Sequence, residues 1–97
     1  MAESTTLQKV TDAVRAGRVR LSDHALTRML ERNIDILSAL DGLNRATIME
    51  DYSLSRGTPR VLVSQREPNG RVLHVVWDAP ENEEQDAVLV TVFHPDR

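Results

Sequence analysis

A chain of 97 residues is long enough to build one hydrophobic core, and we expect a single domain over residues 1–97. Zero cysteines exclude a disulfide scaffold, thiol catalysis and cysteine-ligated zinc. The net charge of −3 argues against bulk electrostatic binding to nucleic acid, and one Trp, one Tyr and one Phe predict no aromatic platform for stacking bases.

Membrane insertion and export are not expected. No apolar run approaches the roughly 20 residues that span a bilayer, and the N-terminal stretch MAESTTLQK lacks the basic and apolar segments of a secretory signal. We therefore expect a cytoplasmic protein.

The N-terminal half has the periodicity of helices. Apolar residues at i, i+3 and i+7 predict a first helix over about Thr5–Ala16, which Gly17 can end. Residues 18–21 are predicted to form a short extended connector. Asp35 can cap a third helix, which Gly42 ends.

The second helix carries the main group of ionisable side chains. Ser22 is a candidate N-cap, and Asn33 can end the helix in the left-handed conformation. At about 100° per residue, one face is polar and the opposite face is apolar. The polar face carries His24, Arg28, Glu31 and Arg32, and the apolar face carries Ala25, Leu26, Met29 and Leu30.

After Arg45 the pattern becomes that of strands. Thr47–Leu54, Val61–Glu67, Arg71–Trp77 and Ala87–His94 are the four candidates. Helices followed by strands with short turns predict an α+β fold, in which two to three N-terminal helices pack on a four-stranded, mainly antiparallel sheet.

The second and third strands form the strongest predicted hairpin, because Asn-Gly supplies the positive φ angles of a two-residue turn. If Asn69 and Gly70 form that turn, Gln65 lies opposite His74. In the same register, Ser64 lies opposite Val75 and Val63 opposite Val76.

Each candidate residue also has a purely structural interpretation. His24, Arg28 and Glu31 could protonate a leaving group and stabilise an oxyanion, or they could form an exposed face with an Arg28–Glu31 ion pair. His74 and Thr91 lie in apolar strands and could be structural residues. No spacing matches a known metal site, although His94 and Asp96 are conceivable ligands; no metal or other cofactor is expected.

Three segments resemble a known family. HALTRMLERNI, LHVVW and VTVFHPD are similar to the small bacterial domain-of-unknown-function family 4258, over about Leu21 to Asp96. Here Asn33 replaces the family's glycine and Phe93 its tyrosine. The family looks like a relative of the RelE-like toxins, which pack N-terminal helices on an antiparallel sheet and often cleave RNA. The resemblance singles out His24, Arg28, Glu31, Arg32, His74 and Thr91.

Two functions follow as hypotheses. The first is a toxin-like, metal-independent ribonuclease in which His24 and His74 are the acid and base, Arg28 and Arg32 bind phosphate, and RNA and a small antitoxin are the partners. The alternative is a non-catalytic domain that binds a small protein. The first hypothesis requires His24 and Arg28 to face the same cleft as His74.

Overall fold

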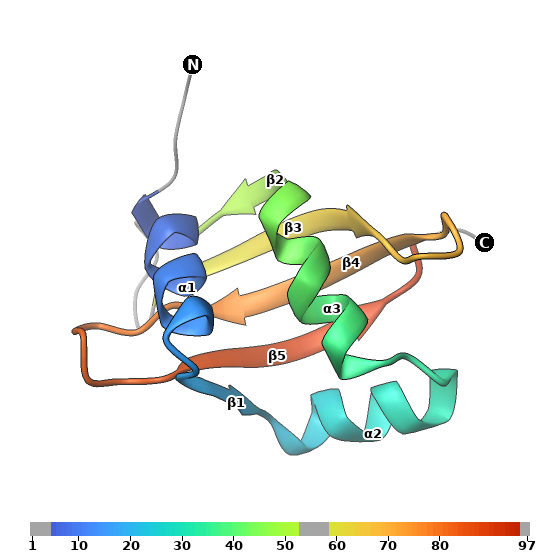
Figure 1. Cartoon of the computed structure of the whole chain (residues 1–97), viewed down its shortest axis with the longest axis horizontal. Helices are drawn as coiled ribbons and strands as arrows, with labels where there is room; N and C mark the ends of the chain where they lie inside the picture. The colour runs from blue at the N-terminus through green and yellow to red at the C-terminus, as the bar shows by residue number, and fades with distance from the viewer. Residues whose placement is uncertain (1–4, 53–58, 96–97) are drawn as a thin grey trace.

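The computed structural model describes residues 5–52 and 59–95, which form three α-helices, one short 3₁₀ helix and one sheet (Figure 1). The helices are α1 (Thr5–Arg15), α2 (Asp23–Arg32), α3 (Ile36–Gly42) and η1 (Leu43–Arg45). The strands are β1 (Val19–Leu21), β2 (Thr47–Asp51), β3 (Arg60–Arg66), β4 (Val72–Asp78) and β5 (Ala87–Phe93). The predicted α+β class is confirmed.

The predicted four-stranded sheet is wrong in one respect: the sheet has five strands and is mixed. Its order is β1-β5-β4-β3-β2, and β1 pairs with β5 in parallel, whereas the other pairs are antiparallel. Residues 18–21 are therefore not only a connector. A strand of three residues is too short to show a period of two, so its pairing could not be recognised from the sequence.

The β3–β4 hairpin forms as predicted, but its register differs by one residue. The Glu67 N–H donates to the Arg71 carbonyl at 2.9 Å, and the Gly70 N–H donates to the Glu67 carbonyl at 2.8 Å. Gly70 alone supplies the positive φ, at 90°, so the loop has three residues instead of two. As a result Ser64, not Gln65, lies opposite His74.

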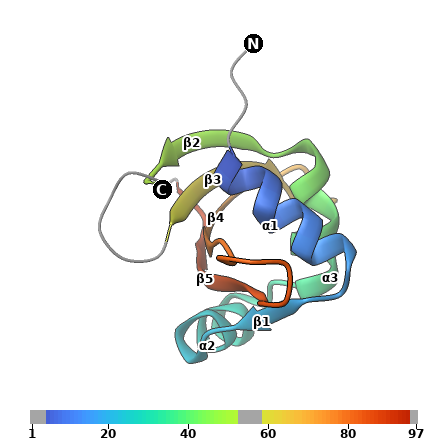
Figure 2. The ribbon, with the colours of Figure 1, turned by 90° about the vertical axis from the view of Figure 1, so that its left-hand side faces the viewer.

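The sheet has one covered face and one face that the described helices leave open. Helices α1 and α3 lie on the same side of the sheet, and α2 runs along the edge formed by β1 and β5 (Figures 1 and 2). Alternate residues of the central strands are buried beneath α1 and α3, including Val63, Val75 and the fully buried Trp77. The open face carries the intervening residues of these strands.

The remaining predicted boundaries fit closely. Gly17 ends α1 with a φ of 80°, and the Asp35 carboxylate accepts a hydrogen bond from the Leu37 N–H at 3.3 Å. The strand predicted over Thr47–Leu54 ends at Asp51, and residues 53 and 54 lie outside the described part of the chain. Within the described ranges, no helix has both the length and the apolar character needed to cross a membrane.

Candidate functional site

Hydrogen bonds of Ser22 attach the start of α2 to β5. The Ser22 hydroxyl accepts a hydrogen bond from the Ala25 N–H at 2.9 Å and donates to the Val90 carbonyl at 2.7 Å. The Ser22 N–H donates to the Leu89 carbonyl at 3.0 Å. At the other end, Asn33 is left-handed, with φ 57° and ψ 45°. Both predicted caps are confirmed, and together they fix which side of α2 faces the sheet.

The apolar face of α2 is only half buried. Ala25 and Met29 are buried against the rest of the domain, whereas Leu26 and Leu30 are 49% and 76% exposed. The four residues share one apolar face of the helix, as predicted, but only Ala25 and Met29 are buried. The two exposed leucines lie on one flank of the helix.

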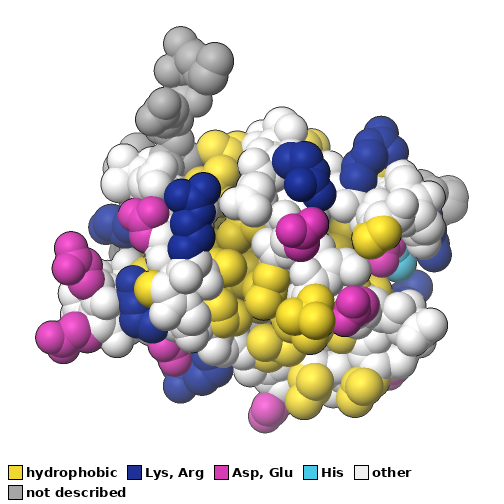
Figure 3. Space-filling view, viewed as in Figure 1, with side chains coloured by type: hydrophobic (Ala, Val, Ile, Leu, Met, Phe, Trp, Pro, Cys, Tyr) yellow, Lys and Arg dark blue, Asp and Glu magenta, His cyan; other side chains and the backbone are white. Residues whose placement is uncertain are grey.

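The polar residues of α2 lie on the opposite flank. Relative to Ala25, helical geometry places Leu26 and Leu30 at about +100° and +140°, and Arg28 and His24 at about −60° and −100°. Figure 3 shows hydrophobic side chains over α2 on the side of α1 and α3. The flank with His24, Arg28 and Glu31 therefore faces the side of the open sheet face.

The Arg28–Glu31 ion pair, which would give this flank a purely structural explanation, is not formed between these described residues. Among residues 5–52 and 59–95, no ion pair joins Arg28 to Glu31, although Arg28 is half-buried. The ion pairs that do form there are Arg45–Asp41, Arg60–Asp78 and His94–Glu67. Arg32, in the last turn of α2, is exposed.

His74 lies in a row of side chains across the open face. Successive register pairs align Thr47 with Ser64, Ser64 with His74, and His74 with Phe93. The His74 and Phe93 rings meet edge to face, with centroids 5.4 Å apart and planes at 73°. Phe93 is 38% exposed. The open face thus carries two adjacent rings, which the low aromatic content of the sequence did not predict.

Thr91 lies between His74 and α2. It pairs with Val76 on the same open face, two residue pairs along from His74, at a register shift in β5. The structure therefore brings His74 and Thr91 together on adjacent strands and places His24 and Arg28 on the neighbouring flank of α2. Within the described chain, no hydrogen bond or ion pair joins His24 or Arg28 to His74 or Thr91.

Arg20 is a cation on this face that sequence reasoning missed. It pairs with Val88, while its neighbours Val19 and Leu21 pair with the buried Ala87 and Leu89. Its side chain therefore points to the open face, where it is exposed. Only the recognition of β1 as a strand would have revealed this orientation.

His94 has a partner that the sequence analysis also missed. Its Nε2 lies 2.7 Å from Glu67 Oε1, and the two side chains are only 6% and 11% exposed. His94 follows Val92 by two residues and Glu67 follows Gln65 by two, so strand alternation carries both onto the covered face. No group of three potential metal ligands occurs among the described residues, and Asp96 lies outside them.

One ion pair lies on the open face where β3 begins and β4 ends. Arg60 and Asp78 are directly opposed on β3 and β4, and Arg60 Nε donates to Asp78 Oδ1 at 2.6 Å. The pKa of Arg60 is raised above its ordinary value, mainly by this hydrogen bond; burial opposes the rise, and the charge of Asp78 adds the smallest contribution to it. Arg60 is thus neutralised locally, unlike Arg20 and Arg28.

Fold and site define a small α+β domain whose open sheet face is bordered by a helix with ionisable side chains. Residues 21–94 match the model of DUF4258, a domain of unknown function, and the chain belongs to this family. The match begins at the last residue of β1 and ends at His94, so it contains every predicted site residue. No curated protein and no solved structure matches the chain.

Proposed function

We propose that this domain is a toxin-like, metal-independent ribonuclease, related to the RelE-like toxins, that binds RNA across the open sheet face and the adjoining flank of α2. The observation that supports it is the orientation of α2, which turns His24 and Arg28 to the same side as His74 and Thr91. A cytoplasmic location and a small antitoxin partner belong to this proposal.

The proposed reaction is transesterification within the RNA strand. A base removes the proton of a 2′-hydroxyl, and the resulting oxygen attacks the adjacent phosphorus. The P–O5′ bond breaks, and an acid protonates the leaving 5′ oxygen, which gives a 2′,3′-cyclic phosphate and a 5′-hydroxyl. One of His24 and His74 is the base and the other is the acid, and Arg28 offsets the charge that develops on the phosphorane.

The other predicted residues have supporting roles in this scheme. Arg32 and Thr91 bind the substrate backbone through charge and a hydroxyl. Glu31 shares the flank with Arg28 and would position its guanidinium once phosphate is bound. Phe93 offers an exposed ring edge to bases, because RNA is commonly recognised by unstacked bases resting on rings.

Cleavage assays on purified protein test the proposal directly. End-labelled single-stranded RNA, incubated with a chelator present, should yield fragments that end in 2′,3′-cyclic phosphate. His24→Ala and His74→Ala should each slow cleavage by roughly 10²- to 10⁴-fold, the usual contribution of an acid or base. Induced expression should arrest growth, and His24→Ala should abolish the arrest.

Lys9→Ala is the matched control, since Lys9 is exposed on α1 and lies away from the α2 flank. It should leave cleavage unchanged. Intact RNA after incubation with folded wild-type protein, together with harmless expression, would remove the basis of the ribonuclease proposal.

A second candidate function is a non-catalytic domain that binds a small protein. Three exposed leucines on α2 and α3 favour it: Leu26, Leu30 and Leu37 are 49%, 76% and 70% exposed. Large exposed apolar side chains near one another often mark protein interfaces. Leu26 and Leu30 lie on the flank of α2 opposite His24, and Leu37 lies on α3, so the two functions are separable.

Substitution on that flank distinguishes the candidates. Leu30→Glu should abolish co-purification of a partner and leave RNA cleavage intact, whereas Thr27→Glu, at another exposed position of α2, should affect neither. If Leu30→Glu purifies with the same partner in the same amount, the exposed leucines are not its binding site.

A further inference from the structure

A pocket with a volume of about 350 Å³ lies at the end of the sheet where β2 and β4 begin and β3 ends. This volume falls within the range of about 300–1,000 Å³ that is usual for small-ligand sites. Two of the six lining residues are arginines and none of the six is acidic, although the chain has a net charge of −3. The pocket therefore favours an anionic ligand. Its lining residues are Arg45, Thr47, Ser64, Gln65, Arg66 and Val72.

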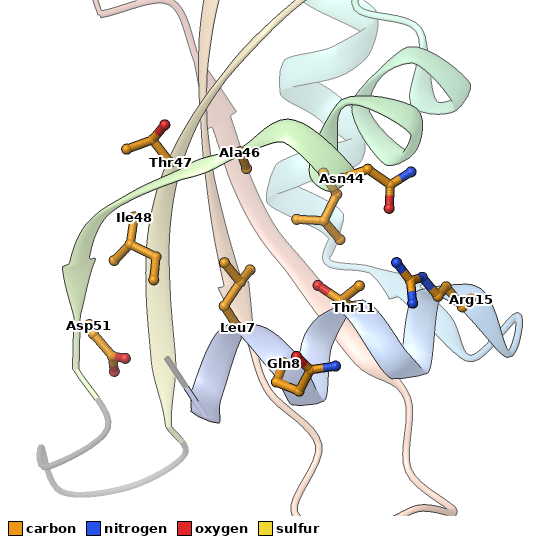
Figure 4. Close-up of a pocket in the computed structure, with 10 residues that line it drawn as sticks. Leu7, Gln8, Thr11, Arg15, Asn44, Ala46, Thr47, Ile48 and Asp51 are labelled. Carbon is orange, nitrogen blue, oxygen red and sulfur yellow. The ribbon is translucent and has the colours of Figure 1, made fainter. Parts of the chain in front are cut away.

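The strand register places this pocket on the open face of the sheet. Thr47 pairs with Ser64, and Ser64 pairs with His74. Arg66 lies two residues beyond Ser64 on β3, so strand alternation turns its side chain to the same face. Figure 4 shows Thr47 and Ile48 on opposite sides of β2, with Ile48 on the side of α1. The pocket thus lies beside His74.

Arg66 is held in place by an uncharged group. Its Nη1 donates a hydrogen bond to the Gly70 carbonyl at 2.7 Å, and it forms no ion pair among residues 5–52 and 59–95. A guanidinium carries five N–H donors, so this bond leaves donors for an oxyanion. The forked, planar arrangement of these donors matches the oxygens of a phosphate. Arg66 is therefore oriented at the pocket with its charge still available.

Arg45 has only a weak competitor for an anion. Its Nη2 lies 3.4 Å from Asp41 Oδ2, and the two side chains are 70% and 73% exposed. Exposed pairs of this kind contribute little to stability, so Arg45 can exchange Asp41 for a phosphate at small cost. A neighbouring pocket shares Arg45 and Arg66 but also contains Asp41 and Glu67, whose carboxylates repel an anion. The pocket without carboxylates is therefore the one that suits a phosphate.

From this lining we propose that the pocket binds a phosphate group of the RNA strand, next to the phosphate that is cleaved. Arg45 and Arg66 supply the positive charge, and the hydroxyls of Thr47 and Ser64 donate hydrogen bonds to the phosphate oxygens. This inference rests on the proposed ribonuclease function and adds a substrate-binding site that lies away from α2.

The pocket also defines a path for the RNA across the open face. Neighbouring strands of a sheet lie about 5 Å apart, so Ser64 lies one strand from His74 and Thr47 lies two strands from it. An RNA strand whose scissile phosphate lies at His74 can therefore place an adjacent phosphate in the pocket. On the other side of His74, Phe93 follows in the same row, where its ring can contact a base.

Binding of a short 2′-O-methyl RNA oligonucleotide, which has no 2′-hydroxyl nucleophile, tests the pocket without relying on cleavage. Arg45→Ala and Arg66→Ala should each weaken binding by about tenfold, as expected for the loss of hydrogen bonds to a charged group. Arg15→Ala is the matched control, because Arg15 is also an exposed arginine but lies on α1, on the covered side of the sheet (Figure 4). It should leave the affinity unchanged, and circular dichroism confirms that each variant is folded.

Neutral methylphosphonate linkages, placed one at a time along the oligonucleotide, locate the bound phosphate. At one position the substitution should weaken binding to wild type by about tenfold and have little further effect on the double variant Arg45→Ala, Arg66→Ala. Such non-additivity shows that the protein and RNA changes remove the same contact.

The outcomes separate this inference from the proposed ribonuclease function. A wild type that cleaves RNA, combined with unchanged affinity in the double variant or an equal loss in Arg15→Ala, would overturn the pocket assignment alone. Loss of affinity in the double variant of a chain that leaves RNA intact would support the pocket and contradict only the proposed catalysis. A folded wild type that does not bind the oligonucleotide, or binds a mononucleotide equally tightly, would overturn the assignment to an RNA strand.

Discussion

Gly42 lies against the buried side chain of Gln65. A Cβ at position 42 would lie 2.6 Å from Gln65 Nε2 and 3.4 Å from the Arg66 carbonyl oxygen. Gln65 is only 4% exposed and cannot swing aside without losing its 2.7 Å hydrogen bond to the Ala39 carbonyl. The pair connects α3 to β3 through a contact that no periodicity in the sequence would reveal.

Gly42→Ala should therefore lower the free energy of unfolding by about 1–2 kcal/mol. Overpacking costs roughly 1–3 kcal/mol, and replacing a helical glycine returns at most about 1 kcal/mol. Denaturant unfolding measures the difference. In a Gln65→Ala background the same change should be neutral or stabilising, because the clash is gone. An equal loss in both backgrounds would show that Gln65 is not the cause.

At the scale of elements, the two N-caps differ in what they hold. Ser22 caps α2 and also bonds to β5, whereas Asp35 caps α3 with an exposed carboxylate and a longer bond, at 3.3 Å. The Ser22 cap therefore stabilises the end of its own helix and also attaches that helix to β5. The Asp35 cap mainly stabilises the end of its own helix.

Ser22→Ala should cost more stability than Asp35→Ala. We expect a loss of about 2 kcal/mol for Ser22→Ala, from the cap and the partly buried Val90 carbonyl left without its donor, against about 1 kcal/mol or less for Asp35→Ala. Unfolding measurements on both variants check the order. Equal losses would mean that the bond to β5 contributes nothing.

Local signals predicted the elements well but not their pairing. The caps at Ser22, Asn33 and Asp35 follow from residue type at a helix end, and they form as predicted. The hairpin register depended on whether one or two loop residues adopt positive φ, and the sequence Pro-Asn-Gly allows either solution. Strand β1 exists only because β5 is there to pair with it.

The candidate site was predictable in its parts and not in its assembly. Helical spacing showed that His24 and Arg28 share a flank, and strand alternation placed His74 with Val72 and Val76. Which flank of α2 faces the open sheet depends on how Ser22 attaches the helix to β5, a contact across 68 residues. Arg20 was missed because its orientation also depends on a long-range contact, the pairing of β1 with β5.

At the scale of the whole molecule, the chain has a net charge of −3, yet the proposed RNA surface carries Arg20 and Arg28, which form no ion pair within the described part of the chain. Uneven charge can steer an anionic ligand to one side even when the total is negative. The salt dependence of RNA binding reports this distribution separately from any cleavage.

Arg20→Ala and Arg28→Ala should each reduce the slope of log affinity against log salt by about 0.7, the release expected for one phosphate contact on a single strand. Binding of uncleavable RNA with a 2′-deoxy linkage provides the measurement. Lys9→Ala, on α1, should leave the slope unchanged. If all three variants change it equally, the open face has no special part in binding.

The parallel pairing of β1 with β5 has a consequence during synthesis. Residues 19–21 leave the ribosome before their partners at 87–89, which emerge only after the intervening residues have been made. Helix α2 also waits for Leu89 and Val90 to hold it in place. The flank with His24 and Arg28 therefore acquires its orientation only after residues 87–90 have emerged, and a nascent chain has no assembled form of the proposed RNA surface before that point.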